Sequence, residues 1–212
     1  MEKEYKNLHY IDYPIVKREI TRLRDKQTSP EFFRAAVNRL SIILAAEISK
    51  KFMLSEIEIE TPLEKTKGYK LSHEIILIPI LRAGLGMVNG FLEIIPDAKV
   101  GHIGMERNEK TLEPQTYYFK IPSTKKNNVI IILDPMLATG GSVTAAVSKL
   151  KSDGIDHCII ASLVSAPDGI KKVFEAHPEV EIYTSALDRE LNNKGYILPG
   201  LGDAGDRTFG TL

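Results

Sequence analysis

Cysteine, tryptophan and net charge are what this sequence has least of, and these shortages exclude several kinds of protein. The one cysteine, Cys158, has no partner within the chain for a disulfide, and its apolar neighbours favour a buried thiol. The 28 basic and 28 acidic residues leave no net charge at neutral pH. Lys and Arg never occur in runs longer than pairs, so we expect no nucleic-acid partner.

Long apolar segments are missing as well. No apolar run approaches the ~18 residues of a membrane-spanning helix, so we expect no membrane contact. The polar start, MEKEYKNLHYID, lacks the apolar core of a signal peptide, which favours a cytoplasmic location. The histidines at 9, 73, 102, 157 and 177 form no pair at metal-ligand spacing, and His102, among small residues, is interpreted as structural. We therefore expect no metal ion held by the protein alone.

The apolar residues that are present form a regular pattern over the whole chain. A length of 212 residues with 43% hydrophobic residues is enough for one domain spanning residues 1–212. Helices are expected at 15–25, 30–52, 87–94, 142–150 and 167–176, and strands at 56–61, 74–81, 129–133, 157–164 and 180–186. Strands that alternate with helices predict an α/β fold with a mostly parallel sheet and helices on both faces.

The connections between these elements are polar. Ser29 before Pro30 predicts a helix start capped by the serine hydroxyl. Residues 62–72 are interpreted as a connection in which Lys65 and Lys67 are simply solvated. Residues 100–122 read as two strands around a polar excursion, which predicts a β-hairpin flap.

The stretch from Val129 to Lys149 carries the strongest functional signal. Five apolar residues deliver Asp134 to the end of a buried strand, and Ala138–Ser142 then turn into a helix. The two glycines of this loop permit a backbone path closed to other residues, and the first amides of the helix have no intrahelical partner. Such a loop binds anions, although the same residues could be only a strand-to-helix turn. We expect a ligand with a phosphate, a ribose or both.

A second glycine-rich loop supports a competing interpretation. Gly84, Gly86 and Gly90 imitate a dinucleotide fingerprint, with Glu106 as a ribose acceptor, which would indicate an NAD-binding half. This alternative leaves the loop after Asp134 unexplained. It also places the charged Arg82 where a dinucleotide turn has bare backbone.

The segment from Asp188 to Leu212 has little periodicity, and its composition alone favours disorder. Its apolar residues at 196–198 and 209 argue for packing instead. Gly200–Gly205 match a dinucleotide fingerprint, but the seven residues that follow are too few for the required helix.

Four segments together resemble the uracil phosphoribosyltransferases, a branch of the type I phosphoribosyltransferases: ILIPILRAGLGM, MERNE, LDPMLATGGS and GYILPGLGDAGDRTFGT, in family order. Most type I members carry two adjacent acidic residues where this chain has Asp134 and Pro135. The resemblance implies the type I phosphoribosyltransferase fold with a β-hairpin flap and a carboxyl-terminal hood at about 186–212. It also implies the family reaction of pyrimidine salvage, in which uracil and 5-phosphoribosyl 1-diphosphate (PRPP) give UMP and diphosphate.

The resemblance assigns roles to matching residues. Asp134, Arg82 and Arg107 are the implied catalytic residues. Implied PRPP contacts are Arg82, Arg107, Asp134, Pro135, Met136, Leu137, Ala138, Thr139, Gly140, Gly141, Ser142 and Asp203, with Mg²⁺ carried mainly by substrate oxygens and water. Implied uracil contacts are Ile197, Gly202, Asp203 and Ala204.

Alternatives and partners remain open. A transferase for another base, or an RNA-binding regulator that responds to pyrimidine nucleotides, could use the same fold; the absence of a basic stripe and the intact final motif favour the enzyme. Family members are commonly oligomeric and some respond to GTP. A homo-oligomer, dimer or tetramer, is expected because the helix from Pro30 has apolar residues to spare.

Overall fold

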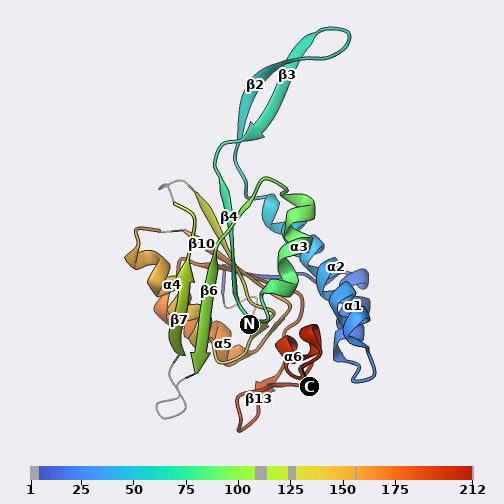
Figure 1. Ribbon diagram of the computed structural model, residues 1–212, viewed down its shortest axis with the longest axis vertical. Coiled ribbons are helices and arrows are strands. Elements are labelled where there is room, and N and C mark those ends of the chain that lie inside the picture. The colour runs from blue at the N-terminus through green and yellow to red at the C-terminus, as the bar shows by residue number, and fades with distance from the viewer. Residues whose placement is uncertain (1–4, 108–113, 124–127, 156, 212) are drawn as a thin grey trace.

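The computed structural model describes residues 5–107, 114–123, 128–155 and 157–211 (Figure 1). The helices are α1 (Pro14–Arg24), α2 (Pro30–Ser49), α3 (Leu85–Ile94), α4 (Gly141–Ser152), α5 (Pro167–Ala176) and α6 (Ala204–Phe209). The strands are β1 (Leu8–Tyr10), β2 (Leu54–Glu60), β3 (Lys65–Leu71), β4 (Ile75–Leu81), β5 (Lys99–Val100), β6 (His102–Arg107), β7 (Pro114–Lys120), β8 (Val129–Leu133), β9 (Met136–Leu137), β10 (Cys158–Ser162), β11 (Val164–Ser165), β12 (Glu181–Thr184), β13 (Glu190–Leu191) and β14 (Ile197–Leu198). No helix of the described residues is long and apolar enough to cross a membrane.

The central sheet is parallel except at one edge, as the alternating pattern predicts. Its strand order is β1-β12-β10-β8-β4-β6-β7, with β5 also paired to β4. Only β7 runs antiparallel within the described sheet, as the second strand of the hairpin with β6. Because β4 and β8 are parallel neighbours, their carboxyl ends lie at the same edge, and the segments after both strands meet there.

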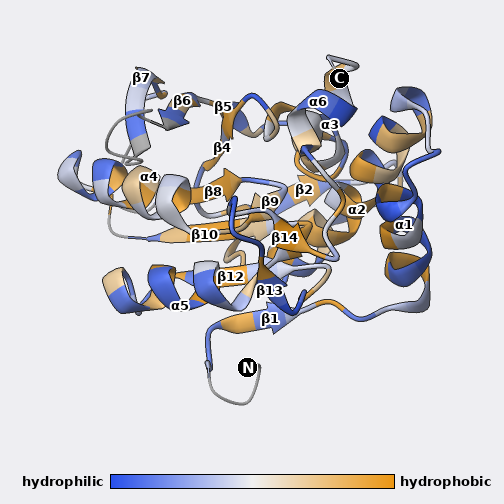
Figure 2. Ribbon diagram, turned by 90° about the horizontal axis from the view of Figure 1, so that it is seen from below, coloured by the Kyte–Doolittle hydropathy of each residue, from blue (hydrophilic) through white to orange (hydrophobic). Residues whose placement is uncertain are grey.

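Two hydrophobic cores cover the two faces of this sheet (Figure 2). Odd-numbered residues of β4, β8 and β10, such as Leu77 and Ile131, face α1, α2 and α3. Even-numbered residues of the same strands, such as Ile78 and Ile132, face α4 and α5. Burial on both faces explains why these strands are continuous apolar runs rather than alternating ones.

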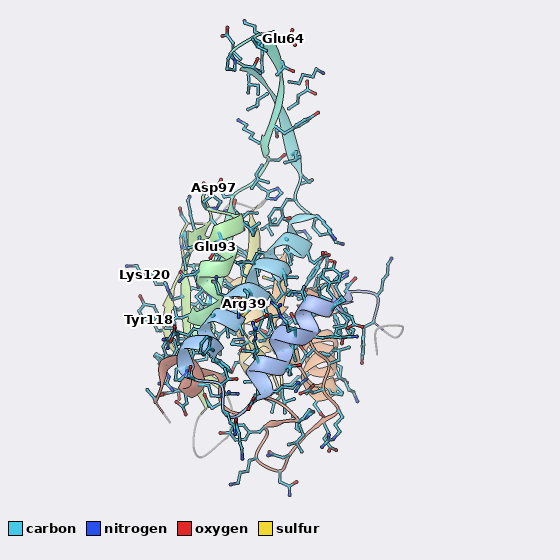
Figure 3. The ribbon with its side chains drawn as sticks, turned by 90° about the vertical axis from the view of Figure 1, so that its right-hand side faces the viewer. Arg39, Glu64, Glu93, Asp97, Tyr118 and Lys120 are labelled. Atoms are coloured by element: carbon cyan, nitrogen blue, oxygen red, sulfur yellow. The ribbon has the colours of Figure 1, made fainter. Side chains whose placement is uncertain are left out.

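Between β2 and β4 the structure corrects the sequence-based expectation. Residues 65–71 are a strand and not a connection: β3 pairs antiparallel with β2, and the hairpin stands away from the body, with Glu64 near its far end (Figures 1 and 3). Lys67 and Lys65 form cross-strand ion pairs, at 2.9 Å to Glu56 and 3.2 Å to Glu58, and are not simply solvated. The segment has no apolar alternation because no core covers it.

Smaller corrections concern short elements and ends. The polar start contains β1, whose three residues are too few to show a period. The helix expected to reach Phe52 ends at Ser49, and the Ser29 hydroxyl makes no capping hydrogen bond. The strand expected at 157–164 is β10, with β11 paired separately to β9. Cys158 is buried as expected, and burial raises the pKa of its thiol to about 12.

The carboxyl-terminal segment is ordered and folds back on the start of the chain. It forms the β13–β14 hairpin and α6, called the hood here (residues 186–211). The Arg24 guanidinium donates to Asp188 Oδ2 at 2.8 Å and to the Gly200 carbonyl at 2.9 Å. Arg207 donates to the carbonyl oxygens of Leu23, Leu201 and Asp25. Two buried or half-buried arginines therefore attach the hood to α1.

Candidate functional site

Two adjoining cavities open at the carboxyl ends of β4 and β8. The first has a volume of 520 Å³ and the second, on the hood side, 460 Å³. Their linings share Ala83, Met136, Asp203 and Gly205. They are thus two lobes of one cleft, called the sheet-side and hood-side cavities below, at the place where open parallel sheets bind ligands.

The loop from Asp134 to Ser142 is held rigidly against its neighbours. The amides of Leu163 and Val164 donate to the Pro135 carbonyl, and that of Ala166 to the Leu137 carbonyl. Gly140 has a φ of 74°, and a Cβ there would lie 2.7 Å from the Gly169 carbonyl oxygen. A residue with a side chain would therefore displace the backbone.

Helix α4 begins directly after Gly140, with Ser142 of its first turn lining the sheet-side cavity. The Thr139 hydroxyl accepts from the Gly141 amide at 3.4 Å. The first amides of a helix have no intrahelical acceptor and lie at the positive end of its dipole. The loop is therefore built to receive an anionic group such as a phosphate.

Asp134 stands at the end of β8 and lines the sheet-side cavity. Its Oδ1 accepts the Met136 amide at 3.2 Å, and its own amide donates to the Ala161 carbonyl. Burial raises the pKa of the carboxyl to about 6, against the opposing effect of the Met136 hydrogen bond. Asp134 is therefore a half-buried carboxylate that gains when a ligand supplies hydrogen-bond donors or positive charge.

Arg82 directly follows β4, and its exposed side chain lines the same cavity. Its Nη2 donates to Asp206 Oδ1 of α6 at 2.9 Å. The strand can bring the arginine this close because Gly84 follows: a Cβ there would lie 2.3 Å from the Leu133 carbonyl oxygen. The guanidinium is thus placed between the sheet and the hood.

The hood-side cavity has a different chemical character. It is lined by Ile197 and by the residues from Gly202 to Gly205, together with the exposed Tyr196 and Lys194. Ala204 is buried and begins α6, and Gly202 has a φ of 81°. Small residues leave main-chain groups accessible, which suits a flat ligand with hydrogen-bonding edges.

The site residues implied by the resemblance are distributed unevenly. The cavity linings include Arg82, Asp134, Met136, Ala138, Ser142, Ile197, Gly202, Asp203 and Ala204. Pro135, Leu137, Thr139, Gly140 and Gly141 do not line either cavity; Leu137 is fully buried in the core. Arg107 ends β6, and Asn108 and Glu109 of the MERNE motif lie outside the described residues.

Three lining residues of the β6–β7 hairpin were not assigned to the site from the sequence, although two of them belong to the MERNE motif and Glu106 appeared as the ribose acceptor of the dinucleotide alternative. Met105 and Glu106 of β6 and Tyr117 of β7 face the sheet-side cavity. A Cβ on Gly104 would lie 2.5 Å from the Tyr117 ring, so the glycine makes room for the tyrosine. This pairing could be foreseen only from the hairpin register, which is shifted at Gly104 and Met105.

The charges in the sheet-side cavity bear on metal binding. Among the described residues, no group of three or more His, Cys, Asp or Glu side chains could hold a metal ion. Of the side chains that the structure describes, those lining the cavity nevertheless include the carboxylates of Glu106, Asp134 and Asp203 and the guanidinium of Arg82. These carboxylates would repel a polyanionic ligand. A divalent cation carried by the ligand would reduce this electrostatic repulsion.

Comparisons with known proteins agree over nearly the whole chain. A family model described as "Uracil phosphoribosyltransferase" matches residues 10–211. Curated proteins named uracil phosphoribosyltransferase include one from Fervidobacterium nodosum, 50% identical with 96% of this chain and 99% of that protein covered. Another, from Bacillus cytotoxicus, is 51% identical, with 96% and 98% covered.

Solved structures show the same fold. The AQ2163 protein of Aquifex aeolicus superposes with a TM-score of 0.91 at 38% identity, covering 95% of this chain and 97% of that one. A hypoxanthine phosphoribosyltransferase from Staphylococcus aureus has a TM-score of 0.53 at 14% identity, covering 74% and 76%. This second likeness concerns the fold alone.

Proposed function

The chain belongs to the uracil phosphoribosyltransferase family, and from this premise we propose that it joins uracil to the ribose of PRPP, giving UMP and diphosphate. One observation of the chain itself carries the proposal. The sheet-side cavity brings Asp134 and Arg82 together with Ser142, in the first helical turn after the anion-binding loop, and it adjoins a hood-side cavity lined by Ile197 and the small residues Gly202, Ala204 and Gly205. A phosphorylated ribose in one lobe can therefore meet a flat base in the other.

In this reaction, uracil N1 forms a bond to the anomeric carbon as the bond from that carbon to the diphosphate oxygen breaks, and the N1 proton is lost. The sugar passes through a cation-like transition state. We assign the 5-phosphate to the loop amides and hydroxyls of Ala138–Ser142, and the ribose hydroxyls to Asp134. The Asp134 carboxylate favours the positive charge that develops on the ribose, because it is fixed before the reaction begins.

We assign the leaving diphosphate to Arg82 and to Arg107, which ends β6 and directly follows Glu106 of the cavity lining. Guanidinium groups bind phosphate oxygens through parallel N–H donors. Mg²⁺ fits this proposal as an ion brought by the substrate, with Asp203 and Asp134 as nearby carboxylates; when bound, it supplies charge neutralisation of the diphosphate. Pro135 and Leu137, also implied as PRPP contacts, accept backbone hydrogen bonds that hold the loop in place.

We assign the base to Ile197 and the main chain of Gly202, Asp203 and Ala204. Uracil presents two carbonyl oxygens and a ring N–H on one flat edge, and backbone amides and carbonyls can match this pattern. A buried donor or acceptor that the wrong base leaves unpaired costs about 1 to 3 kcal/mol, which is enough for selection.

A panel of bases tests the proposal. The protein is incubated with PRPP, Mg²⁺ and either uracil, cytosine, hypoxanthine or guanine, and diphosphate release is measured together with the nucleotide product. We expect release with uracil and UMP as the product. Preferred turnover of a purine, or no turnover of uracil, would overturn the assignment.

We further propose that the protein is a homo-oligomer, but on different grounds from those of the sequence. The apolar face of α2, which suggested an oligomer, packs mostly within the chain. The β2–β3 hairpin gives better support, because it projects into solvent with Leu63 94% and Tyr69 65% exposed. An isolated two-stranded hairpin is at best marginally stable in water, so a second copy of this chain would stabilise it.

Two further proposals come from the family resemblance: a cytoplasmic location and activation by GTP. Cell fractionation tests the first. Initial rates measured with and without GTP, at fixed Mg²⁺ and subsaturating PRPP, test the second.

A further inference from the structure

Asp206 of α6 lies outside both cavities but bonds to residues of each. Its Oδ1 accepts from Arg82 Nη2 at 2.9 Å, and Arg82 lines the sheet-side cavity. Its backbone amide donates to Asp203 Oδ1 at 2.8 Å, and Asp203 lines both cavities. Asp206 is therefore a direct link between the arginine of one lobe and the backbone turn of the other.

Asp206 is also held in place by the residues that follow α6. The Thr211 hydroxyl donates to the same Oδ1 at 2.6 Å, and the amides of Gly210 and Thr211 donate to the Asp206 carbonyl. The Thr211 hydroxyl, followed by the Arg82 guanidinium, holds the pKa of this carboxyl below its ordinary value. Asp206 is thus ionised at neutral pH and cannot turn freely.

Arg82 keeps most of its hydrogen-bonding capacity for a ligand. A guanidinium has five N–H donors, and of the described residues only Asp206 accepts from this one. Gly205 lies between the partners: a Cβ there would be 3.2 Å from Asp203 Oδ1 and 3.7 Å from Arg82 Nη2. Arg82, Asp203 and Asp206 therefore surround one turn of α6, and a shift of that turn moves all of them.

We propose that Asp206 is a positioning residue that couples the two cavities. A base bound against Gly202, Asp203 and Ala204 fixes the first turn of α6, and with it Asp206. Asp206 in turn keeps Arg82 in the orientation that binds diphosphate. Ordering a long side chain in advance removes part of the entropy cost of binding. Binding of the base therefore strengthens binding of diphosphate, and by thermodynamic linkage the reverse is equally true.

This inference rests on the proposed function, and a binding experiment separates the two. Diphosphate with Mg²⁺ is titrated into the full-length protein by calorimetry, with and without saturating uracil. No reaction can occur, since the ribose is absent. In the wild type we expect uracil to tighten diphosphate binding by about fivefold or more, the lower range of measured couplings. In Asp206→Ala the two affinities for diphosphate should be equal.

Two more variants separate positioning from loss of structure. Asp206→Asn keeps a weaker acceptor for Arg82, so it should retain part of the coupling. Asp188→Asn weakens the bond from Arg24 to the hood and the bond from the Gly200 amide within the hood, without touching Arg82. It should lower the melting temperature but leave diphosphate binding in the absence of uracil unchanged.

The outcomes are distinct. Equal coupling in wild type and Asp206→Ala, or no coupling in the wild type, overturns the role of Asp206 while leaving the proposed function intact. A wild-type protein that binds neither uracil nor diphosphate removes the proposed function and this inference with it. Loss of coupling in Asp206→Ala, with partial retention in Asp206→Asn, supports the inference.

Discussion

A carboxyl group that is half-buried at the end of a buried strand is costly to ionise, and Asp134 is such a group. Its proposed role requires the ionised form. Asp134→Asn keeps the size of the side chain but removes the charge that favours the cation-like ribose. We expect turnover to fall by the equivalent of ~2 to 4 kcal/mol of transition-state stabilisation, measured as kcat/KM for PRPP. Near-normal turnover would refute the assignment of Asp134.

The same substitution should increase stability. The folded-state pKa of about 6 lies above the unfolded value, so the contribution of Asp134 to stability is fully present below about pH 4 and is lost as the pH rises through 6. Asparagine cannot ionise. Asp134→Asn should therefore be more stable than the wild type above pH 6, by at most about 3 kcal/mol, and the difference should shrink toward pH 4.

Urea unfolding between pH 4 and pH 8 measures this difference. The exposed Asp97, labelled in Figure 3, provides a control, because Asp97→Asn removes a carboxylate outside the site. A stability difference for Asp134→Asn that does not depend on pH would show that the burial of Asp134 costs nothing.

A substitution at Ala204 tests whether the base binds in the hood-side cavity. Its methyl group is buried beside the hood-side cavity, and valine would add two carbons there. Crowding of this kind costs about 1 to 3 kcal/mol. The KM for uracil in Ala204→Val should rise several-fold, whereas the KM for PRPP should change little. If both constants rise together, the base does not bind against this turn.

Single residues that could be identified from the sequence were those within recognisable motifs. Asp134 and Arg82 each follow a continuous apolar run, so their place at strand ends was predictable. Glu106 and Asp206 also lie within these motifs, but nothing local showed that Glu106 lines the cavity or that Asp206 accepts a hydrogen bond from Arg82, 124 residues away. Contacts across more than a hundred residues leave no local pattern.

At the scale of elements, Arg207 is the more deeply buried of the two arginines that attach the hood to α1. Arg207 donates to three backbone carbonyl oxygens and stacks 4.5 Å from the centre of the Phe33 ring. Arg207→Met preserves much of the apolar contact but leaves these oxygens without their donor. We expect a loss of about 2 to 5 kcal/mol in unfolding free energy and a weaker affinity for uracil.

Arg189 offers a matched control for this experiment. It lies in the same segment, is exposed, and pairs only with its neighbour Glu190 among the described residues. Arg189→Met should change the unfolding free energy by less than about 0.5 kcal/mol. A similar loss in both variants would mean that the hood is not attached through Arg207.

The elements that could be predicted are those with a core to bury. Strands β4, β8 and β10 and helix α5 follow from apolar runs or apolar periodicity. Strand β3, with the sequence KTKGYKL, has only two large apolar residues because it pairs with β2 outside the core. Polar cross-strand pairs stabilise β3, and they leave none of the apolar alternation from which a strand is predicted.

At the scale of the whole molecule, the exposed hairpin predicts a mass larger than one chain. Light scattering at micromolar concentration should give a dimer or a larger assembly. Shortening the hairpin by replacing residues 57–68 with a two-residue turn removes Leu63 and the ion pairs with Lys65 and Lys67. This variant should lower the assembled fraction. A wild-type protein of monomeric mass would contradict the proposal.

The attachment of the hood to α1 has a consequence for synthesis of the chain. Residues 200–211 are translated after every strand of the central sheet, yet they pack against residues 23–34. Amino-terminal parts of a chain fold first as they leave the ribosome. A growing chain can therefore fold its phosphate loop while the surface for the base is still incomplete. Messages cut short before Gly200 should yield polypeptides that hold phosphorylated sugar but never select a base.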